Sequence, residues 1–464
     1  MTNYRTPGVY VEEISSFPPS VAQVETAIPA FIGYTETGPT EPTRISSMID
    51  YRAIFGGPNN EIETFSIDGD GNITGASSIP RTPKYRLYYM LEMFFANGGG
   101  DCFIISVGDY TDSITKAKMT SGLELLAKED VPTLILFPDA ESSKNSGDAF
   151  DMYNAALEQC KERKDRFLIC DVPHSEATIN TIEASAEEFR NAVTGDGLMF
   201  GAAYFPNLKT TMSYQYSESD IKVNIKGDEI TLRLSDADIE NGANEETSLF
   251  HADEGAYRNK YHAIRKMIGD VRLELPPSAA MAGVYARVDS SRGVWKAPAN
   301  VSLNRVSAPK LKISDRDQAG LNDTSTGKTI NAIRSFKGKG VMVWGARTMD
   351  SNDLEWRYIS VRRFFNMVEE SVKNASERFV FEPNDANTWV KVKAMVENYL
   401  TTLWRSGAMM GGKPEDAFFV RVGLGETMSL EDVTNGRMIV EIGMAVVRPA
   451  EFIILRFSHK MMES

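Results

Sequence analysis

The organisation of this chain is best approached from residues 339–372, KGVMVWGARTMDSNDLEWRYISVRRFFNMVEESV. Its first part, residues 341–344, is apolar and largely β-branched, and it stands between Gly340 and Gly345. A short apolar run between two glycines predicts a buried strand, followed by a position where the backbone can turn.

The second half of the same stretch predicts a helix. Residues 350–353, Asp-Ser-Asn-Asp, offer side chains that accept hydrogen bonds from the free N–H groups of a helix start. Apolar residues then recur at helical spacing and form one stripe. The members of this stripe are Val361, Phe364, Phe365, Val368 and Val372. The basic residues Arg357, Arg362 and Arg363 lie off the stripe, so strand, tight turn and helix together predict one α/β corner.

Length and composition set the class of protein. A chain of 464 residues is too long for one ordinary hydrophobic core, so we expect about two or three domains. With 42% hydrophobic and 25% charged residues, the chain has the composition of a globular protein and not of a disordered one. The formal net charge of -14 argues against a surface that binds nucleic acid.

Cysteine usage and hydropathy predict the compartment. Cys102, Cys160 and Cys170 lie in or beside apolar segments, and their odd number disfavours a disulfide framework. The sequence shows neither a signal peptide nor a run of about 18 apolar residues, so we expect no export by that route and no membrane span. We therefore expect folding in a reducing cytoplasm.

Strand and helix patterns fill most of residues 29–205, and from the strand at 102–107 onward they alternate regularly. We expect strands at 29–34, 102–107, 133–137, 167–171 and 198–205, and helices at 47–55, 83–96, 113–128, 147–163 and 180–193. Strands separated by helices of this length predict βαβ units with right-handed crossovers. The fold class is therefore α/β, with a largely parallel sheet covered on both faces.

Other segments depart from this rhythm. Residues 208–262 contain a hairpin signal at Lys226-Gly227-Asp228 and an acidic stretch, and we interpret them as an insertion exposed on the outside. The polar, glycine-rich residues 61–80 are expected to form a loop. Nearer the C-terminus we expect strands at 378–381, 418–422 and 437–447 and a helix over 385–407.

Motifs for phosphate and metal binding are incomplete. Gly327-Lys328-Thr329 lacks the glycine that a phosphate loop needs five places earlier, where Asn322 stands. Residues 68–72, Asp-Gly-Asp-Gly-Asn, lack the later glycine and glutamate of a calcium loop, so we expect a turn. Residues 98–100, three glycines, follow a helix instead of opening one, which indicates a helix stop.

Catalytic constellations are also missing from the sequence. Four histidines show no spacing typical of metal ligands, no cysteine pair is spaced as CxxC, and no GxSxG elbow occurs. Carboxylates are plentiful, but the sequence gives no pair with acid–base geometry. We therefore expect no catalytic, cofactor-binding or metal-ligating residues.

Both ends of the chain carry apolar strand patterns. Residues 9–14 are separated from the next element by a linker with Pro18-Pro19, and residues 452–457 follow Pro449. Free strand edges of this kind would promote aggregation. Two interpretations remain open: the strands pair within their own subunit, or each completes the sheet of a neighbouring copy by β-augmentation.

Several stretches resemble, in the same order, the contractile tail sheath proteins of phages and phage-like injection machines. They are Thr-Pro-Gly-Val-Tyr-Val-Glu-Glu at 6–13, residues 276–300, Trp-Gly-Ala-Arg-Thr at 344–348 with Trp-Arg-Tyr at 356–358, and Pro-Ala-Glu-Phe at 449–452. The resemblance covers most of the chain, whereas residues 208–262 match no pattern of the family.

The resemblance implies a structural subunit and not an enzyme. Such subunits polymerise helically around an inner tube and contract to drive the tube through a target envelope, without a cofactor. The family's two terminal arms link subunits by strand exchange. The resemblance assigns to these arms Val9, Tyr10, Val11 and Glu12 at the start of the chain, and Phe452, Ile453, Ile454, Leu455 and Phe457 at its end.

The resemblance also implies partners and a location. The expected partners are further copies of this chain, an inner tube protein, baseplate and terminator (cap) proteins, and sheath paralogues, with neither nucleic acid nor direct membrane insertion. Assembly is expected in the cytoplasm, as part of a phage tail or of a phage-like injection particle that can be released outside the cell.

We expect three parts: an N-terminal arm and linker (1–27), a middle α/β domain (28–299) with the insertion, and a C-terminal inner α/β domain (300–464) that packs with the N-terminal arm and ends in the C-terminal strand. The inner domain should face the tube. Candidates for that contact are Arg357, Arg362, Arg363, Lys391 and Lys393, which are alternatively ordinary solvated helix faces. Rival functions are a baseplate or tube-associated component and a nucleotide-dependent α/β enzyme.

Overall fold

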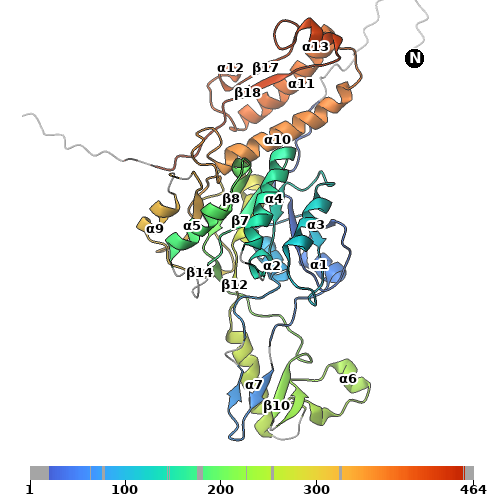
Figure 1. Ribbon diagram of the computed structural model, residues 1–464, viewed down its shortest axis with the longest axis vertical. Helices are drawn as coiled ribbons and strands as arrows, with labels where there is room; N and C mark the ends of the chain where they lie inside the picture. The colour runs from blue at the N-terminus through green and yellow to red at the C-terminus, as the bar shows by residue number, and fades with distance from the viewer. Residues whose placement is uncertain are drawn as a thin grey trace, which may run out of the picture. The chain divides into compact units, whose positions relative to one another are not determined.

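The computed structural model describes residues 20–62, 64–75, 79–143, 145, 147–174, 181–225, 227–251, 255–322, 325, 327–452 and 454. The chain divides into two compact units (Figure 1). The larger unit comprises Glu25–Met367 and Arg448–Ser464, and the smaller unit comprises Val368–Val447 and Met1–Val24. The expected boundary near residue 300 therefore does not coincide with this division, because the strands that follow residue 300 belong to the sheet of the larger unit.

A nine-stranded sheet forms the centre of the larger unit. In spatial order its strands are β13 (Val301–Ser302), β16 (Gly340–Val343), β15 (Ile330–Phe336), β8 (Gly201–Phe205), β7 (Phe167–Asp171), β6 (Leu134–Leu136), β1 (Pro29–Gly33), β5 (Cys102–Ser106) and β2 (Thr43–Ile45). The six strands from β15 to β5 run parallel, whereas β2, β16 and β13 at the edges are antiparallel to their neighbours. The predicted α/β class with a largely parallel sheet is confirmed.

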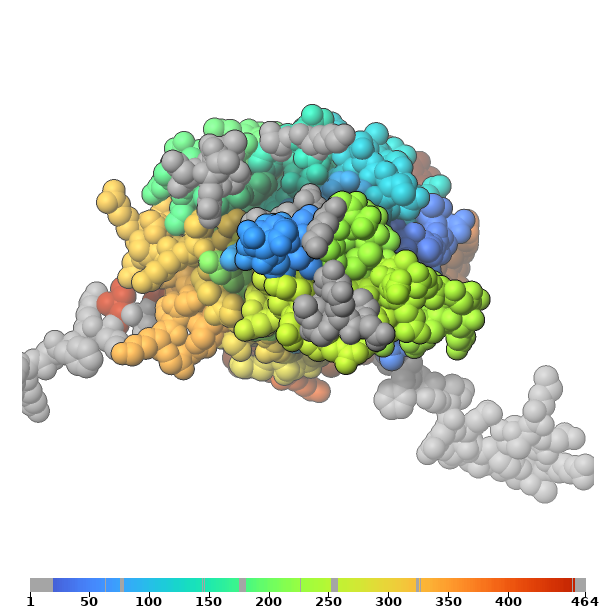
Figure 2. Space-filling view, turned by 90° about the horizontal axis from the view of Figure 1, so that it is seen from below, coloured from blue at the N-terminus to red at the C-terminus, as the bar shows by residue number. Residues whose placement is uncertain are grey.

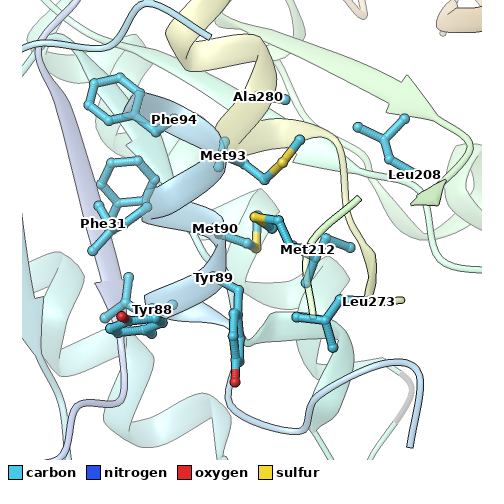
Figure 3. Close-up of a cluster of buried hydrophobic side chains, with 14 of the residues drawn as sticks. Phe31, Tyr88, Tyr89, Met90, Met93, Phe94, Leu208, Met212, Leu273 and Ala280 are labelled. Atoms are coloured by element: carbon cyan, nitrogen blue, oxygen red, sulfur yellow. The ribbon is translucent and has the colours of Figure 1, made fainter. Parts of the chain in front are cut away.

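Helices cover both faces of this sheet. They are α1 (Met48–Phe55), α2 (Leu87–Ala96), α3 (Lys116–Leu126), α4 (Asp148–Arg163), α5 (Ile182–Ala192), α8 (Ser278–Arg292) and α9 (Asp315–Leu321). Because side chains of a strand alternate between faces, Phe31 packs with α2 and α8, while Ile32 packs with α3 and α4. On the first face, Met90 of α2 faces Met212 (Figure 3).

For residues 339–372, the predicted strand is confirmed and the predicted tight turn is wrong. The predicted strand is β16, but a loop over 344–358 separates it from the helix α10 (Ile359–Ser376). The first turns of α10 are buried on all sides instead of along one stripe. The division between the two units falls within this helix.

The insertion builds a small sheet with a distant segment. The sheet contains, in order, β11 (Asp228–Thr231), β10 (Lys222–Ile225), β3 (Phe65–Ile67) and β4 (Ile73–Thr74), accompanied by α6 (Asp236–Glu240) and α7 (Gly255–Asp270). The predicted hairpin is confirmed, but the prediction of a loop at 61–80 is wrong. Phe65 and Val223 pack in one core, and β3 lies beside β10 (Figure 2, blue beside yellow-green).

A separate three-stranded sheet includes the first residues of this insertion. It consists of β12 (Glu274–Leu275), β9 (Leu208–Thr210) and β14 (Val306–Pro309), all paired antiparallel. Residues 208–210, which the sequence assigns to the insertion, thus belong to a sheet completed by a strand from beyond residue 300.

The smaller unit is mostly helical. It contains the second half of α10, α11 (Ala386–Arg405), α12 (Pro414–Ala417), α13 (Leu430–Thr434), and the strands β17 (Phe418–Arg421) and β18 (Glu441–Met444). The predicted cap of α11 is confirmed, since the Asp385 side chain accepts from the N–H of Thr388. The strand predicted at 378–381 is wrong: Glu377–Phe379 form a 3-10 turn, and Phe381 has a φ of 69°.

Candidate functional site

The incomplete phosphate-loop motif is used for contacts within the fold. The Thr329 hydroxyl lies 2.6 Å from Ser351 Oγ, and Ser351 donates both its N–H and its hydroxyl to the carbonyl of Gly327 at 2.8 Å. The Lys328 ammonium donates to the carbonyl of Arg190, and burial lowers the pKa of Lys328. These groups bind other parts of the chain and do not form a phosphate cradle.

The two glycine-containing motifs are turns, as predicted. Asp68 Oδ1 accepts from the N–H groups of Asp70 at 3.0 Å and Asn72 at 2.7 Å between β3 and β4, and the bond from Asn72 lowers the pKa of Asp68 most. Gly98 ends α2 with a φ of 105°, a conformation that favours glycine. Among the described residues, no three His, Cys, Asp or Glu side chains are grouped so that they could hold a metal ion.

Buried carboxylates occupy the edge of the sheet where α/β enzymes carry their sites. Asp139, after β6, accepts from the N–H groups of Tyr34 at 2.9 Å and Arg86 at 2.5 Å. Asp171, at the end of β7, accepts from the N–H of Ser278 at 2.7 Å. Burial raises the pKa of Asp139 to about 6, and burial followed by the nearby charge of Glu141 raises the pKa of Asp171 to about 8.

These carboxylates have a structural use. Arg86 immediately precedes α2 and Ser278 opens α8, so Asp139 and Asp171 accept from donors that the two helix starts leave unpaired. Asp139 and Asp171 are 0% and 3% exposed, which leaves almost no surface to meet a substrate. The cluster therefore explains how α2 and α8 are seated on the sheet, and it gives no indication of a reaction.

An open cleft of about 530 Å³ lies beside α1 and α2. It is lined by Glu36, Arg52, Gly57, Pro58, Asn59, Asn60, Tyr88, Tyr110, Gln215, Tyr216, Ser217 and Asp220. Arg52 Nε donates to the Tyr88 hydroxyl at 2.8 Å, and the Tyr110 hydroxyl donates to the carbonyl of Gly57 at 2.8 Å. Much of the polar lining is thus engaged within the protein, and the cleft does not indicate a class of ligand.

The predicted terminal strands lie mostly outside the described residues. This applies to Val9, Tyr10, Val11 and Glu12, and to Ile453, Leu455 and Phe457. Phe452 and Ile454 are described, and they are 79% and 77% exposed and belong to no strand of the subunit. Two large apolar side chains are therefore exposed to solvent where the C-terminal arm is predicted.

The smaller unit contains an incomplete sheet. β17 and β18 pair antiparallel, Phe418 opposite Met444 and Arg421 opposite Glu441. Within the described part of the chain, no third strand is added to this pair. Beyond β18, Met410 donates its N–H to the carbonyl of Ala445 at 2.7 Å. Two strands alone are only marginally stable, and their outer edges hold N–H and C=O groups that another strand could bind.

The root of the C-terminal segment is held by an arginine. Arg347 donates from Nε to Glu451 Oε1 at 2.9 Å and from Nη2 to Oε2 at 2.6 Å, and its side chain is 9% exposed. The hydrogen bonds with Glu451 raise the pKa of Arg347. Asn331, on β15, bonds both the N–H and the carbonyl of Arg347 at 2.8 Å. Two of the segments that carry the family resemblance thus meet in space.

The root of the N-terminal linker is held in the same manner. Arg363 Nη2 donates to the carbonyl of Thr26 at 2.8 Å and to Asp289 Oδ2 at 2.5 Å, while the Thr26 hydroxyl donates to Asp289 at 2.6 Å. The guanidinium also lies 4.5 Å from the centre of the Tyr285 ring. The charge of Asp289, the hydrogen bonds and the Tyr285 ring together offset the free-energy cost of burying the Arg363 cation.

The structure distributes the five tube-facing candidates unevenly. Arg362 and Arg363 are only 3% and 4% exposed, and Arg362 lies 4.2 Å from the Trp356 ring, so in this conformation neither offers surface to a partner. Arg357 is partly exposed and donates to the carbonyl of Ser351. On α11, Lys391 is exposed and Lys393 is half-buried. Helical spacing could not detect the burial of the two arginines, because it does not report what packs on the far side of α10.

Sequence reasoning missed Asp289, Asn331 and Glu451 as site residues. Glu451 stands inside a stretch noted for its family resemblance, which was the available signal. Asp289 lies within residues 276–300, another stretch noted for its family resemblance.

Of the described helices, none is both long enough and apolar enough to cross a bilayer.

Comparison with known proteins finds phage tail sheath domains along most of the chain. The model of the phage tail sheath protein central domain matches residues 149–349, and that of the phage tail sheath C-terminal domain matches residues 351–460. The tail sheath protein of Enterobacteria phage T4 is 28% identical over 154 residues, or 33% of this chain. The matched part spans 23% of that relative, so most of the phage protein has no counterpart in the match.

Solved structures extend the match to the whole chain. A chain of the PVC sheath complex of an extracellular contractile injection system, in its contracted state, is 33% identical, with 99% of both chains covered and a TM-score of 0.67. A chain of the helical sheath of the anti-feeding prophage (AFP), also contracted, is 32% identical, with 98% of this chain and 100% of that chain covered and a TM-score of 0.65. On this fold and this full-length similarity, the chain belongs to the contractile tail sheath family.

Proposed function

We propose that this chain is the repeating subunit of a contractile sheath that polymerises helically around an inner tube and contracts to drive the tube through a target envelope. The observation that carries the proposal is the incomplete sheet of β17 and β18, in a chain whose apolar Phe452 and Ile454 are exposed. In this proposal, the pair β17 and β18 accepts a strand and the segment that contains Phe452 and Ile454 donates one. That combination supports assembly through the addition of strands from neighbouring copies.

The geometry of such an exchange favours a helical polymer. The surface that donates a strand differs from the surface that accepts one, so the interface is heterologous. A heterologous interface that does not close into a ring generates an open helix. Each added strand also satisfies edge groups of β17 or β18, which removes an aggregation hazard.

Contraction in this scheme requires no nucleotide. Folded bodies rotate against one another while the arms keep their main-chain pairing. Each subunit needs to gain only about a few kcal/mol from new lateral contacts, in the range of ordinary two-state switches, and many subunits add up.

The proposal also covers partners and location. The inner tube is expected to contact Lys391 and Lys393 of the smaller unit and Arg357 of the larger one, within the C-terminal part of the chain. Baseplate proteins, a terminator (cap) protein and sheath paralogues are the further partners. We place assembly in the cytoplasm, and the finished machine in a phage tail or in an injection particle released from the cell.

Negative-stain microscopy of the purified chain tests the proposal. The full chain should form hollow cylinders wider than a bare tube. A variant lacking residues 1–14 should remain folded, soluble and monomeric, because it cannot donate its N-terminal strand. The matched control, Val9→Ile with Val11→Ile, keeps the strand and should polymerise.

Two outcomes would contradict this proposal. Normal sheaths from the variant lacking residues 1–14 would remove the N-terminal strand from the assembly. Narrow tubes or discs from the full chain would instead favour a tube or baseplate component.

A further inference from the structure

Both arm roots are held by arginines from one short segment. Residues 344–363, here called the anchor segment, supply Arg347 to the C-terminal side and Arg363 to the N-terminal side. The two arginines bind residues far away in the sequence, Glu451 and Thr26 with Asp289. The segment thus holds Thr26 and Glu451, which are far apart in the sequence, on one body, the larger unit.

The C-terminal anchor is built to resist displacement. The Arg347–Glu451 pair is bidentate and only 9% and 23% exposed, so water competes weakly for either partner. Asn331 is fully buried and fixes Arg347 by its N–H and its carbonyl, at 2.8 Å each. Since Asn331 lies on β15, in the nine-stranded sheet, a pull on Glu451 is passed to the core of the larger unit.

The described chain turns to solvent directly after this anchor. Glu451 is bound, whereas Phe452 is 79% exposed and Ile454 is 77% exposed. Among the described residues, Glu451 is therefore the last one held by an ion pair or a side-chain hydrogen bond to the larger unit. Among the described residues, the chain is thus bound at Glu451 and exposed from Phe452 onward.

The N-terminal anchor also ties the chain to buried residues, but the linker is bound again beyond it, because the Val24 N–H donates to Ser371 Oγ at 3.0 Å. Thr26 is bound through its carbonyl by Arg363 and through its hydroxyl to Asp289, which lies on α8. α8 packs against the nine-stranded sheet, so this root is also tied to the core of the larger unit. The side chains of Arg363 and Asp289 are 3% and 7% exposed.

We propose that the anchor segment carries the tension on both arms, and that Arg347 and Arg363 are positioning residues: Arg347 fixes where the exchanged C-terminal strand begins, and Arg363 fixes the N-terminal linker at Thr26. The inference rests on the proposed function, because load exists only in an assembled sheath. The anchors keep a pulled strand from drawing further residues out of the subunit. The C-terminal anchor thereby sets the length of free chain that leads to the neighbouring copy.

The first test reads the C-terminal anchor without any sheath. Unassembled full-length chain is treated with chymotrypsin, and cleavage after Phe452 is followed by mass spectrometry. A protease needs several extended residues on both sides of the bond, so an anchored Glu451 slows cleavage. Glu451→Gln should be cleaved roughly 10- to 100-fold faster, the factor expected from a charged hydrogen bond that closes a local opening.

Matched variants separate anchoring from general stability. Reversing both charges, Arg347→Glu with Glu451→Arg, should restore slow cleavage, which a merely structural role for either side chain would not do. Asp101→Asn breaks the exposed Arg44–Asp101 pair elsewhere in the larger unit and should leave cleavage after Phe452 unchanged. The melting temperature of each variant shows whether the whole unit is affected.

The second test uses assembled sheaths. Sheared sheaths of Glu451→Gln should break into pieces at least twofold shorter than those of the wild type and of the charge-reversed variant, measured by negative-stain microscopy. Cleavage of Glu451→Gln within twofold of the wild type would overturn the anchor. Fast cleavage with sheaths of unchanged length would overturn its role under load. A wild type that forms no sheath would defeat the proposed function and, with it, the role in carrying tension, while the cleavage result would still report the anchor.

Discussion

Asp289→Asn tests the N-terminal root through the stability of the larger unit. Asp289 accepts from two nitrogens of Arg363, at 2.5 and 3.1 Å, and from the Thr26 hydroxyl at 2.6 Å. Asparagine keeps the shape of the side chain but removes its charge and replaces one acceptor with a donor. The substitution therefore leaves the Arg363 guanidinium buried without a counter-charge.

The size of the effect follows from burial. Both partners are less than a tenth exposed, and breaking one side of a buried ion pair costs about 3–5 kcal/mol. The Tyr285 ring at 4.5 Å and the Thr26 carbonyl still stabilise the Arg363 cation and offset part of this cost. We therefore expect a loss of about 3 kcal/mol in the free energy of unfolding. The exposed pair Arg44–Asp101, 53% and 40% exposed, provides the scale, because Asp101→Asn should cost at most about 1 kcal/mol.

Urea titration followed by circular dichroism measures both variants against the wild type, and the change in midpoint multiplied by the slope gives the loss in the free energy of unfolding. A second variant, Asp289→Leu with Arg363→Met, removes both charges and should recover most of the stability. If Asp289→Asn costs no more than Asp101→Asn, the pair does not hold the linker and the reasoning fails.

Three further predictions use the same titration. Gly283→Ala should cost about 1–3 kcal/mol, since a Cβ there would lie 2.4 Å from the Phe94 carbonyl, where α8 meets α2; a neutral result would mean that the helices separate freely. Asp171 binds its proton more tightly in the folded state, with a pKa of about 8, so its contribution to stability is present below about pH 4 and is lost as the pH rises toward 8. Asp171→Asn should therefore gain stability relative to the wild type between pH 5 and pH 8, and a pH-independent difference would contradict this. Arg166→Met should cost about 3 kcal/mol, because Arg166 is fully buried, pairs with Asp165 and donates to two backbone carbonyls; a loss below about 1 kcal/mol would show that water replaces it.

Much of the fold could be predicted because its signals are local. The apolar runs that became β1, β5, β6 and β7 are buried on both faces of a parallel sheet, and such strands stand out against the helices between them. The cap at Asp385 and the turn at Asp68 follow from side chains that bind their own neighbours in the chain. The order of the resembling stretches indicated the family for the same reason, since it needs no knowledge of what meets in space.

The remaining features depend on partners that are distant in the sequence. Residues 65–74 appear as a polar loop until β10, more than 150 positions later, provides an edge for β3 to pair with. Arg362 and Arg363 of α10 appear solvated until the loop before the helix and α8 close over them. With 50 basic and 64 acidic residues, the chain permits a very large number of ion pairs. Only the packed sheet selects Arg347 with Glu451, 104 positions apart, because burial removes water as the competing partner and leaves one geometry in which both charges are satisfied.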